Sequence, residues 1–210
     1  MTGAARAAAP PGTPARKPSF RRELARKAIH LSSAAVPVAL AFGVERRVAL
    51  FVLGALTLVA LAVEAGRAAS PSIAARFETV FRPLLRAHES TSVTGATWLI
   101  GAMFAAVLLL PRDAAIIATW AAAAGDTAAA LIGMRFGRTR SSRDGKSLEG
   151  SAACLAVTVG GALLLTPAGL TVALLAAVAA TAAERFPWPR DDNVRIITAV
   201  GVVLMIAVAL

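Results

Sequence analysis

Apolar residues dominate seven stretches of the chain, and polar residues gather in the short segments between them. The stretches lie at residues 28–44, 48–63, 93–110, 114–134, 151–166, 168–183 and 194–210. Each is close to the ~17–25 residues that a helix needs to cross a bilayer. The pattern predicts an all-α, polytopic integral membrane protein with about seven transmembrane helices. Several stretches are short, so these helices are expected to stand nearly upright in the membrane.

The composition agrees with this interpretation. Hydrophobic residues make up 57% of the 210 residues and charged residues only 16%, which is more apolar surface than a soluble domain of this size can bury. The net charge of +10 would suit nucleic acid, but the basic residues lie between apolar segments and only 5% of residues are aromatic. A nucleic-acid partner is therefore not predicted. The single cysteine, Cys154, excludes an intramolecular disulfide.

The distribution of Lys and Arg predicts the orientation. With a cytoplasmic N-terminus, all of the 22 Lys and Arg residues lie in inner segments except Arg46, Arg47 and Arg112. Inner loops of membrane proteins are enriched in positive charge, so the N-terminus is predicted to be cytoplasmic and the C-terminus external. The uncharged turn at residues 166–169 fits an outer hairpin.

Two segments outside the spans have a character of their own. Residues 1–22 contain no acid and no signal-peptide core, which predicts a disordered basic tail before a membrane domain at 23–210; an organellar transit peptide is the weaker alternative. Between the second and third spans, Ser70 and Pro71 are typical of a helix start, and Pro83 is expected to end that helix or kink it. An apolar stripe predicts that the helix lies on the inner membrane surface.

Acids, histidines and amides also lie almost entirely on the predicted inner side, although the topology was drawn from Lys and Arg alone. Only Glu45 and Asp113 are outside. The inner set comprises Lys27, His30, Glu64, Arg67, His88, Glu89, Asp126, Asp191, Asp192 and Asn193. This convergence beside lipid predicts chemistry between a water-soluble reactant and a lipid headgroup.

Asp126 is the strongest single candidate, because a carboxylate inside a span is costly and usually marks an ion, proton or substrate site. A structural aspartate bonded to a neighbouring helix is the alternative. The residues around it, Ala121, Gly125, Ala129, Gly133 and Gly137, form a face of small side chains. Such a face allows another helix to approach closely and predicts a tight polar cleft near the carboxylate.

A basic loop follows this helix. Arg135, Arg138, Arg140, Arg143 and Lys146 surround two glycines, which is typical of phosphate binding, although positive-inside anchoring explains any single arginine as well. Residues 145–147 resemble the end of a P-loop. The first glycine of that motif would fall at Arg140, however, and no strand precedes it, so a Walker-type ATPase is excluded.

Three motifs in this region resemble the nucleotide-binding region of the dolichol kinase and phytol kinase family, which includes a CTP-dependent diacylglycerol kinase. They are Gly-Asp-Thr-Ala-Ala-Ala-Leu-Ile-Gly at 125–133, Arg-Phe-Gly-Arg at 135–138 and Gly-Lys-Ser-Leu-Glu-Gly-Ser at 145–151. Phosphatidate cytidylyltransferases share a similar region. Segments 23–30, 88–98 and 191–193 resemble other motifs of the kinase branch, and the chain has no histidine after His88, unlike the cytidylyltransferase signature. Val194 follows the last motif where the family usually has proline.

The resemblance implies a kinase that transfers the γ-phosphoryl group of CTP to a lipid alcohol at the cytoplasmic face, with Mg²⁺. It implies Asp126 as a catalytic and metal-binding carboxylate and Asp192 as a second metal ligand, with Asn193 beside it. Lys27 and His30 would contact phosphate or the lipid hydroxyl, and Glu89 would be a general base. The triphosphate would be bound by Gly125, Arg138, Gly145, Lys146, Ser147, Glu149 and Gly150. Among these, Lys146 would also be catalytic, and Glu149 would orient Lys146 or share the metal.

Several alternatives stay open at this stage. CTP and ATP are not distinguished by the residues, nor are dolichol, shorter polyprenols, phytol, geranylgeraniol and diacylglycerol as acceptors. A cytidylyltransferase is the nearest other enzyme. A small ion-coupled transporter could use Asp126 as an ion site, but the outer halves of the spans are almost wholly apolar and provide no polar pathway.

Overall fold

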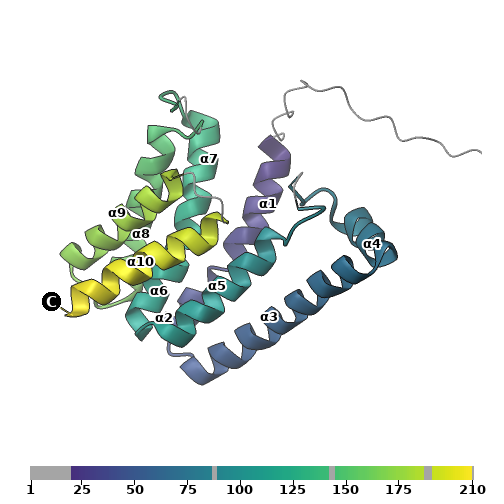
Figure 1. The fold of residues 1–210 in the computed structure, drawn as a ribbon. Helices are drawn as coiled ribbons and strands as arrows, with labels where there is room; N and C mark the ends of the chain where they lie inside the picture. The colour runs from purple at the N-terminus through teal and green to yellow at the C-terminus, as the bar shows by residue number, and fades with distance from the viewer. Residues whose placement is uncertain (1–19, 87–88, 142–144, 187–190, 210) are drawn as a thin grey trace, which may run out of the picture.

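The computed structural model describes residues 20–86, 89–141, 145–186 and 191–209, and within these ranges it contains helices and no β-strand (Figure 1). Most of the expected basic tail, residues 1–19, lies outside the described residues, as does His88. The helices are α1 (Phe20–Ser32), α2 (Ala35–Ala41), α3 (Arg46–Ala69), α4 (Pro71–Phe81), α5 (Gly95–Leu109), α6 (Arg112–Trp120), the π-helix η1 (Ala121–Gly125), α7 (Asp126–Phe136), α8 (Leu148–Leu165), α9 (Leu170–Arg185) and α10 (Asp192–Ala209).

Three of the described helices are long and apolar enough to cross a membrane. They are α3, the continuous α6–η1–α7 helix from Arg112 to Phe136, and α8, while α5 is apolar but shorter. The all-α class is therefore confirmed, and the chain has the helices of a membrane-associated protein. These helices contain no proline and at most two charged residues in their apolar windows, which explains why they run unbroken.

The prediction of a single helix over 28–44 is wrong, because the helix is interrupted between α1 and α2. Pro37 has no N–H to donate to the carbonyl of Ser33, and its ring crowds that carbonyl. Just before it, the hydroxyls of Ser32 and Ser33 donate to the carbonyls of Ile29 and His30, each at 2.6 Å. These local bonds compete with the helical ladder, so α1 ends at Ser32.

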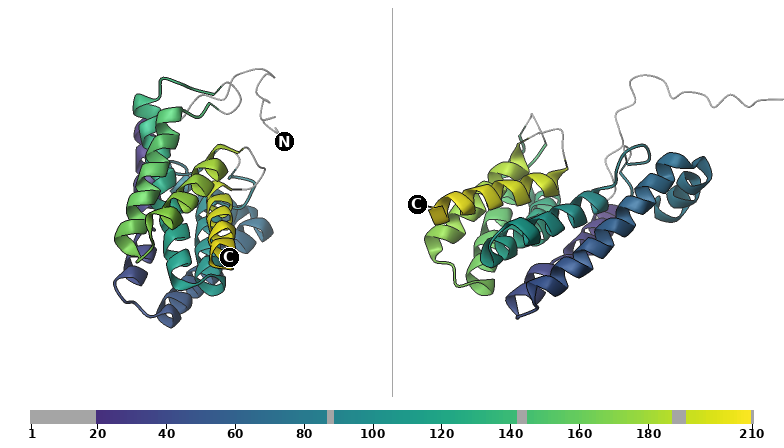
Figure 2. Two further views of the ribbon diagram at one scale, coloured as in Figure 1. Left: turned by 90° about the vertical axis from the view of Figure 1, so that its left-hand side faces the viewer. Right: turned by 60° about the horizontal axis from the view of Figure 1, so that its bottom comes forward.

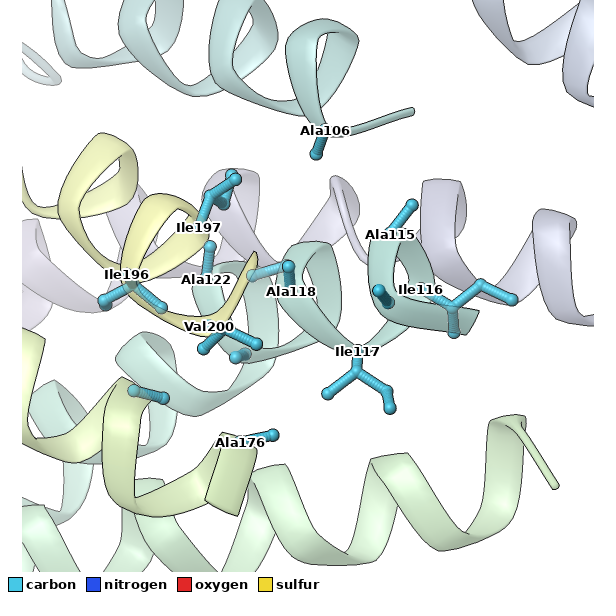
Figure 3. Packing of buried hydrophobic residues seen from close by; sticks show 14 of the residues in the cluster. Ala106, Ala115, Ile116, Ile117, Ala118, Ala122, Ala176, Ile196, Ile197 and Val200 are labelled. Atoms are coloured by element: carbon cyan, nitrogen blue, oxygen red, sulfur yellow. The ribbon is translucent and has the colours of Figure 1, made fainter. Parts of the chain in front are cut away.

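The α6–η1–α7 helix is the centre of the bundle. Its apolar window is 72% buried, against 6% for α3, which leaves α3 with most of its apolar surface exposed to its surroundings. Figure 3 shows Ala118, Ala122 and Ile117 of this helix near Val200 of α10 and Ala176 of α9. Helix α9 packs on both α8 and α10, while α3 packs on α5 at the opposite edge (Figures 1 and 2). The many alanines of the core allow these close approaches.

The predicted small face of this helix does receive another helix. A Cβ on Gly133 would lie 3.0 Å from the Ser147 hydroxyl, and one on Gly150 would lie 2.6 Å from the carbonyl of Ala129. Helices α7 and α8 therefore meet at backbone distance, and the prediction is confirmed. The contact holds the start of α8 against α7, one turn beyond Asp126.

Helix α4 also follows the sequence prediction. It begins at Pro71 and ends at Phe81, before Pro83. The Phe77 ring packs against Phe81, with centroids 4.6 Å apart, and the Arg67 guanidinium lies 4.4 Å from the Phe77 centroid. The Arg67 contact ties α4 to the end of α3, which lies at the edge of the molecule away from α8 and α9 (Figure 1).

Gly161 makes room for the indole of Trp120, and a substitution there is expected to destabilise the bundle. A Cβ on Gly161 would lie 1.9 Å from Trp120 Nε1, which donates to the carbonyl of Val157 at 2.9 Å. We expect Gly161→Ala to lower the free energy of unfolding by about 1–3 kcal/mol, because Trp120 must move and lose its bond. Thermal unfolding in detergent measures the change. Gly160→Ala is the matched control, since a Cβ there meets nothing within 4 Å; equal melting temperatures would contradict the packing argument.

Candidate functional site

A buried ion pair joins α1 to the central helix. The ammonium of Lys27 donates to Asp126 Oδ2, and the two side chains are only 3% and 9% exposed. His30 lies one turn further along α1, with Nε2 3.7 Å from the same oxygen and 3.0 Å from the carbonyl of Ala122. The structure thus brings together three residues that the sequence proposed as functional.

The position of Asp126 depends on the π-helix that precedes it, which the sequence did not indicate. The main-chain N–H of Asp126 bonds to the carbonyl of Ala121, five residues earlier. This extra residue in the turn changes the phase of the helix, and π-helical turns are frequent at functional sites. Within the same turn, the carbonyl of Ala122 points to His30. The irregular turn therefore contributes directly to the site.

Two cavities meet at this ion pair. The first has a volume of about 450 Å³ and a mostly apolar surface; α3, α4 and α5 contribute most of its apolar lining, while α1, the loop before α5 and residues 191–193 contribute polar side chains. The second has a volume of about 650 Å³ and is bounded by α1, α7, the loop before α8, and the start of α8. Both are lined by Lys27, Asp126 and Asp192. We name them the apolar cavity and the polar cavity. A group bound in either one can reach the same carboxylate.

The polar cavity holds most of the residues predicted to bind a triphosphate. Gly145, Lys146, Ser147 and Gly150 all line it. The Ser147 hydroxyl accepts from the main-chain N–H of Gly150 at 3.0 Å and caps α8. The N-terminus of a helix favours anions, because its first N–H groups are unpaired and carry partial positive charge. The wall near Lys146 is therefore suited to phosphate.

Three predicted nucleotide-site residues do not line the polar cavity. Glu149 Oε1 accepts from the main-chain N–H groups of Arg138 and Thr139, at 3.1 and 3.2 Å, so this carboxylate fixes the loop rather than orienting Lys146. Arg138 is exposed. Gly125 faces α8, where a Cβ would lie 2.8 Å from the Thr158 hydroxyl. Each of the three has a packing or loop-closing role in the structure.

Arg140 lines the polar cavity instead of Arg138. Its guanidinium donates to the carbonyl of Gly133 at 2.7 Å and to that of Gly145 at 3.0 Å. These bonds join the end of α7 to the loop before α8. The sequence places Arg140 in the basic loop but does not distinguish it from its neighbours, because all of them are arginines between glycines.

The lining of the apolar cavity includes Glu89, which was predicted as a general base. Its Oε2 accepts from the main-chain N–H of Arg86 at 2.7 Å, and its Oε1 accepts from that of Gly95 at 2.9 Å. Glu89 thus holds the loop before α5. Nearby, Glu64 Oε1 accepts from Thr94 and Thr97, a network that the sequence did not predict.

The segment 191–193 reaches the same region. Asp191 Oδ1 accepts from the main-chain N–H and the amide of Asn193, at 2.9 and 2.6 Å, and so caps α10. Burial raises the pKa of the Asp191 carboxyl above its usual value, against the opposing effects of Asn193 and Arg86. Asp192 pairs with Arg195 and lines both cavities, and Asn193 is buried and lines the apolar one.

Glu184 is the functional candidate that the sequence did not indicate. It is buried near the end of α9, lines the polar cavity, and its Oε1 lies 2.8 Å from the ammonium of Lys146. The one available signal was its position as the only acid in the Ala-rich segment 170–185.

For a metal ion, the described part of the chain holds no group of three or more His, Cys, Asp or Glu side chains with ligand geometry. Mg²⁺ does not need such a group, because it commonly binds through one or two carboxylates together with substrate phosphates. Asp126 and Asp192 line the same two cavities, and a cation, the Lys27 ammonium, already contacts Asp126. Two carboxylates that line the same cavities are donors of the type that Mg²⁺ takes together with phosphate oxygens, and in the structure each is paired with a cation, Asp126 with Lys27 and Asp192 with Arg195.

Comparisons of the chain with protein-family profiles, with curated protein sequences and with solved structures found no match.

Proposed function

We propose that this chain is a membrane-embedded lipid kinase that transfers the γ-phosphoryl group of a nucleoside triphosphate, CTP by resemblance, to a lipid alcohol of the polyprenol, dolichol or phytol type. The observation that carries the proposal is the meeting of an apolar and a polar cavity at Lys27 and Asp126. A reaction between a lipid and a water-soluble phosphate donor requires two such compartments. The proposal includes seven membrane spans and a cytoplasmic N-terminus, with both cavities opening toward the cytoplasmic side.

The polar cavity is the proposed donor site. Lys146, Arg140 and the capped start of α8 provide positive charge and N–H donors along one wall. Lys27 lies where the two cavities join, which is where the terminal phosphate would be positioned. Its ammonium would neutralise the charge on the transferred phosphoryl group.

The apolar cavity is the proposed acceptor site. Phe77, Phe81, Leu84 and Leu85 from α4 and the following turn face Val63 and other residues of α3 and α5 across it. An isoprenoid chain gains about 0.8 kcal/mol per buried CH₂ and would remain in apolar surroundings while its hydroxyl reaches the polar side chains of the lining. These include His30, Asp126 and Asn193.

The transfer would form a bond between the lipid oxygen and the γ-phosphorus and break the bond from that phosphorus to the β-bridging oxygen, releasing CDP. Asp126 and Asp192 would hold Mg²⁺, which offsets negative charge on the phosphates. His30 in its neutral form can donate from Nε2 to the carbonyl of Ala122, which leaves Nδ1 as an acceptor for the hydroxyl proton. These groups would align the hydroxyl with the phosphate.

The test uses purified protein in lipid nanodiscs with candidate alcohols or phosphatidate, Mg²⁺, and CTP labelled at either the α or the γ phosphorus. We expect label in the lipid only from γ-labelled CTP. Lipid labelled only from the α position would make the protein a cytidylyltransferase and overturn the kinase proposal. Label from neither, in folded protein and with ATP tested in parallel, would also overturn it and would favour the ion-coupled transporter.

A further inference from the structure

The acid at the end of α9 binds one lysine through two separate acceptors. The Lys146 ammonium lies 2.8 Å from Glu184 Oε1 and also donates to the main-chain carbonyl of Glu184. Lys146 belongs to the loop before α8, 38 residues earlier in the chain. The pair therefore ties the nucleotide-site loop to a helix that carries none of the predicted nucleotide-binding residues.

The local chemistry explains why this lysine binds here. The last carbonyls of a helix have no intrahelical donor, and the C-terminus carries partial negative charge, so a cation is favourable at that position. The carboxylate adds a full charge next to it. The Glu184 side chain is 8% exposed and the Lys146 side chain 28% exposed, so the carboxylate is the buried partner and the lysine extends from it toward the cavity.

The other carboxylate oxygen indicates more than a structural role. Glu184 Oε2 is buried and has no hydrogen-bond partner among the residues that the structure describes. A buried acceptor without a donor lowers stability, and buried ion pairs are often no more stabilising than apolar residues of the same size. A buried polar atom without a partner therefore needs an explanation, and a catalytic role is one of those known. The cavity that Glu184 lines is the place where such a function can act.

We propose that Glu184 is a positioning residue for phosphoryl transfer: it fixes the Lys146 ammonium on the wall of the polar cavity before the nucleotide binds. This inference rests on the proposed kinase function. A lysine side chain has four rotatable bonds and loses that freedom when it contacts a phosphate. Glu184 restricts the side chain in the empty protein, so the loss is not added to the barrier of the reaction.

Substitution of Glu184 should lower kcat without raising KM for CTP. The negative charge of Glu184 repels an anionic nucleotide in the ground state, while its hold on Lys146 serves the transition state. Glu184→Gln removes the charge and weakens the hold. We therefore expect kcat to fall by about 10–100-fold, the effect of a small displacement of a reacting group, while KM for CTP stays the same or falls.

Arg185→Gln is the matched control. Arg185 is the next residue of α9, bonds to the Ser151 hydroxyl at 3.0 Å, and does not line either cavity. We expect this variant to keep the wild-type kcat and KM. Thermal unfolding is measured for both variants. An unchanged kcat for Glu184→Gln would overturn the proposal, and so would a rise in KM accompanied by a lower melting temperature, which is the result of a purely structural role.

A second measurement does not depend on turnover. The protein in nanodiscs is treated briefly with an amine-acylating reagent, and modification of Lys146 is quantified by mass spectrometry. Pairing with Glu184 should slow acylation, so we expect Lys146 to react severalfold faster in Glu184→Gln than in the wild type or in Arg185→Gln. Equal rates would overturn the role of Glu184. Absence of γ-phosphoryl transfer by the wild type would instead overturn the kinase function, so the two failures are distinguishable.

Discussion

Replacing Asp126 with Asn is expected to reduce γ-phosphoryl transfer by about 100–1,000-fold, the range measured when one charge-stabilising group is removed from an active site. Asp126 lines both cavities and binds the Lys27 ammonium. Its neutral isostere has no charge with which to attract a divalent cation or to fix Lys27 at the junction. The measurement is the transfer of label from γ-labelled CTP to lipid by the purified variant in nanodiscs.

The loss must be separated from unfolding, because Asp126→Asn leaves the buried Lys27 without its carboxylate. Breaking a buried pair from one side costs about 3–5 kcal/mol, whereas removing both charges restores much of the stability. The double variant Lys27→Met with Asp126→Asn should therefore regain stability but not activity. If the double variant regained transfer, the role of the ion pair would be packing alone. Asp113→Asn is the matched control, since it makes the same change at an exposed acid of α6.

Parts of this fold could be predicted because they depend on residues close together in the sequence. Pro71 starts α4 and Pro83 follows its end, and the small face around Gly133 receives α8. The first span could not be placed correctly from hydropathy, because its break depends on the hydroxyls of Ser32 and Ser33 together with Pro37. The π-helix before Asp126 leaves no signal in a run of alanines.

The site divides in the same way. The gathering of polar residues in one region could be predicted from their positions between the apolar stretches, and several of those residues do line one cavity. The contacts between these residues could not be predicted, because Lys27 and Asp126 are 99 positions apart and meet only through the packing of α1 on α7. Glu149 and Glu89 each match a motif, and in the structure each also bonds to main-chain N–H groups of its own loop, a contact that the motifs do not indicate. A motif assigns a region, whereas tertiary contacts decide which member faces the ligand.

A second pair of variants should affect the two substrates separately, one through each cavity. Lys146→Gln removes a charged donor from the polar cavity. We expect KM for CTP to rise by about 10–100-fold, as the loss of one charge-assisted hydrogen bond implies, kcat to fall as in Glu184→Gln, and KM for the lipid to stay unchanged. Ala60→Phe adds a ring to the wall of the apolar cavity and should have the reverse effect, lowering kcat/KM for the lipid by a similar factor while CTP binding stays the same. Steady-state assays that vary each substrate in turn measure both.

Each of these two variants is paired with its own control. Ala55→Phe places the same ring on an exposed face of α3, so it reports any general effect of a larger residue on that helix. Lys146→Gln leaves Glu184 without a cation, so its melting temperature is measured beside its kinetics. If each variant affects only its own substrate, donor and acceptor reach the ion pair from different sides, as phosphoryl transfer at a membrane surface requires. If either variant impairs both substrates equally in folded protein, the two cavities act as one binding site, and the assignment of lipid to one and nucleotide to the other is wrong.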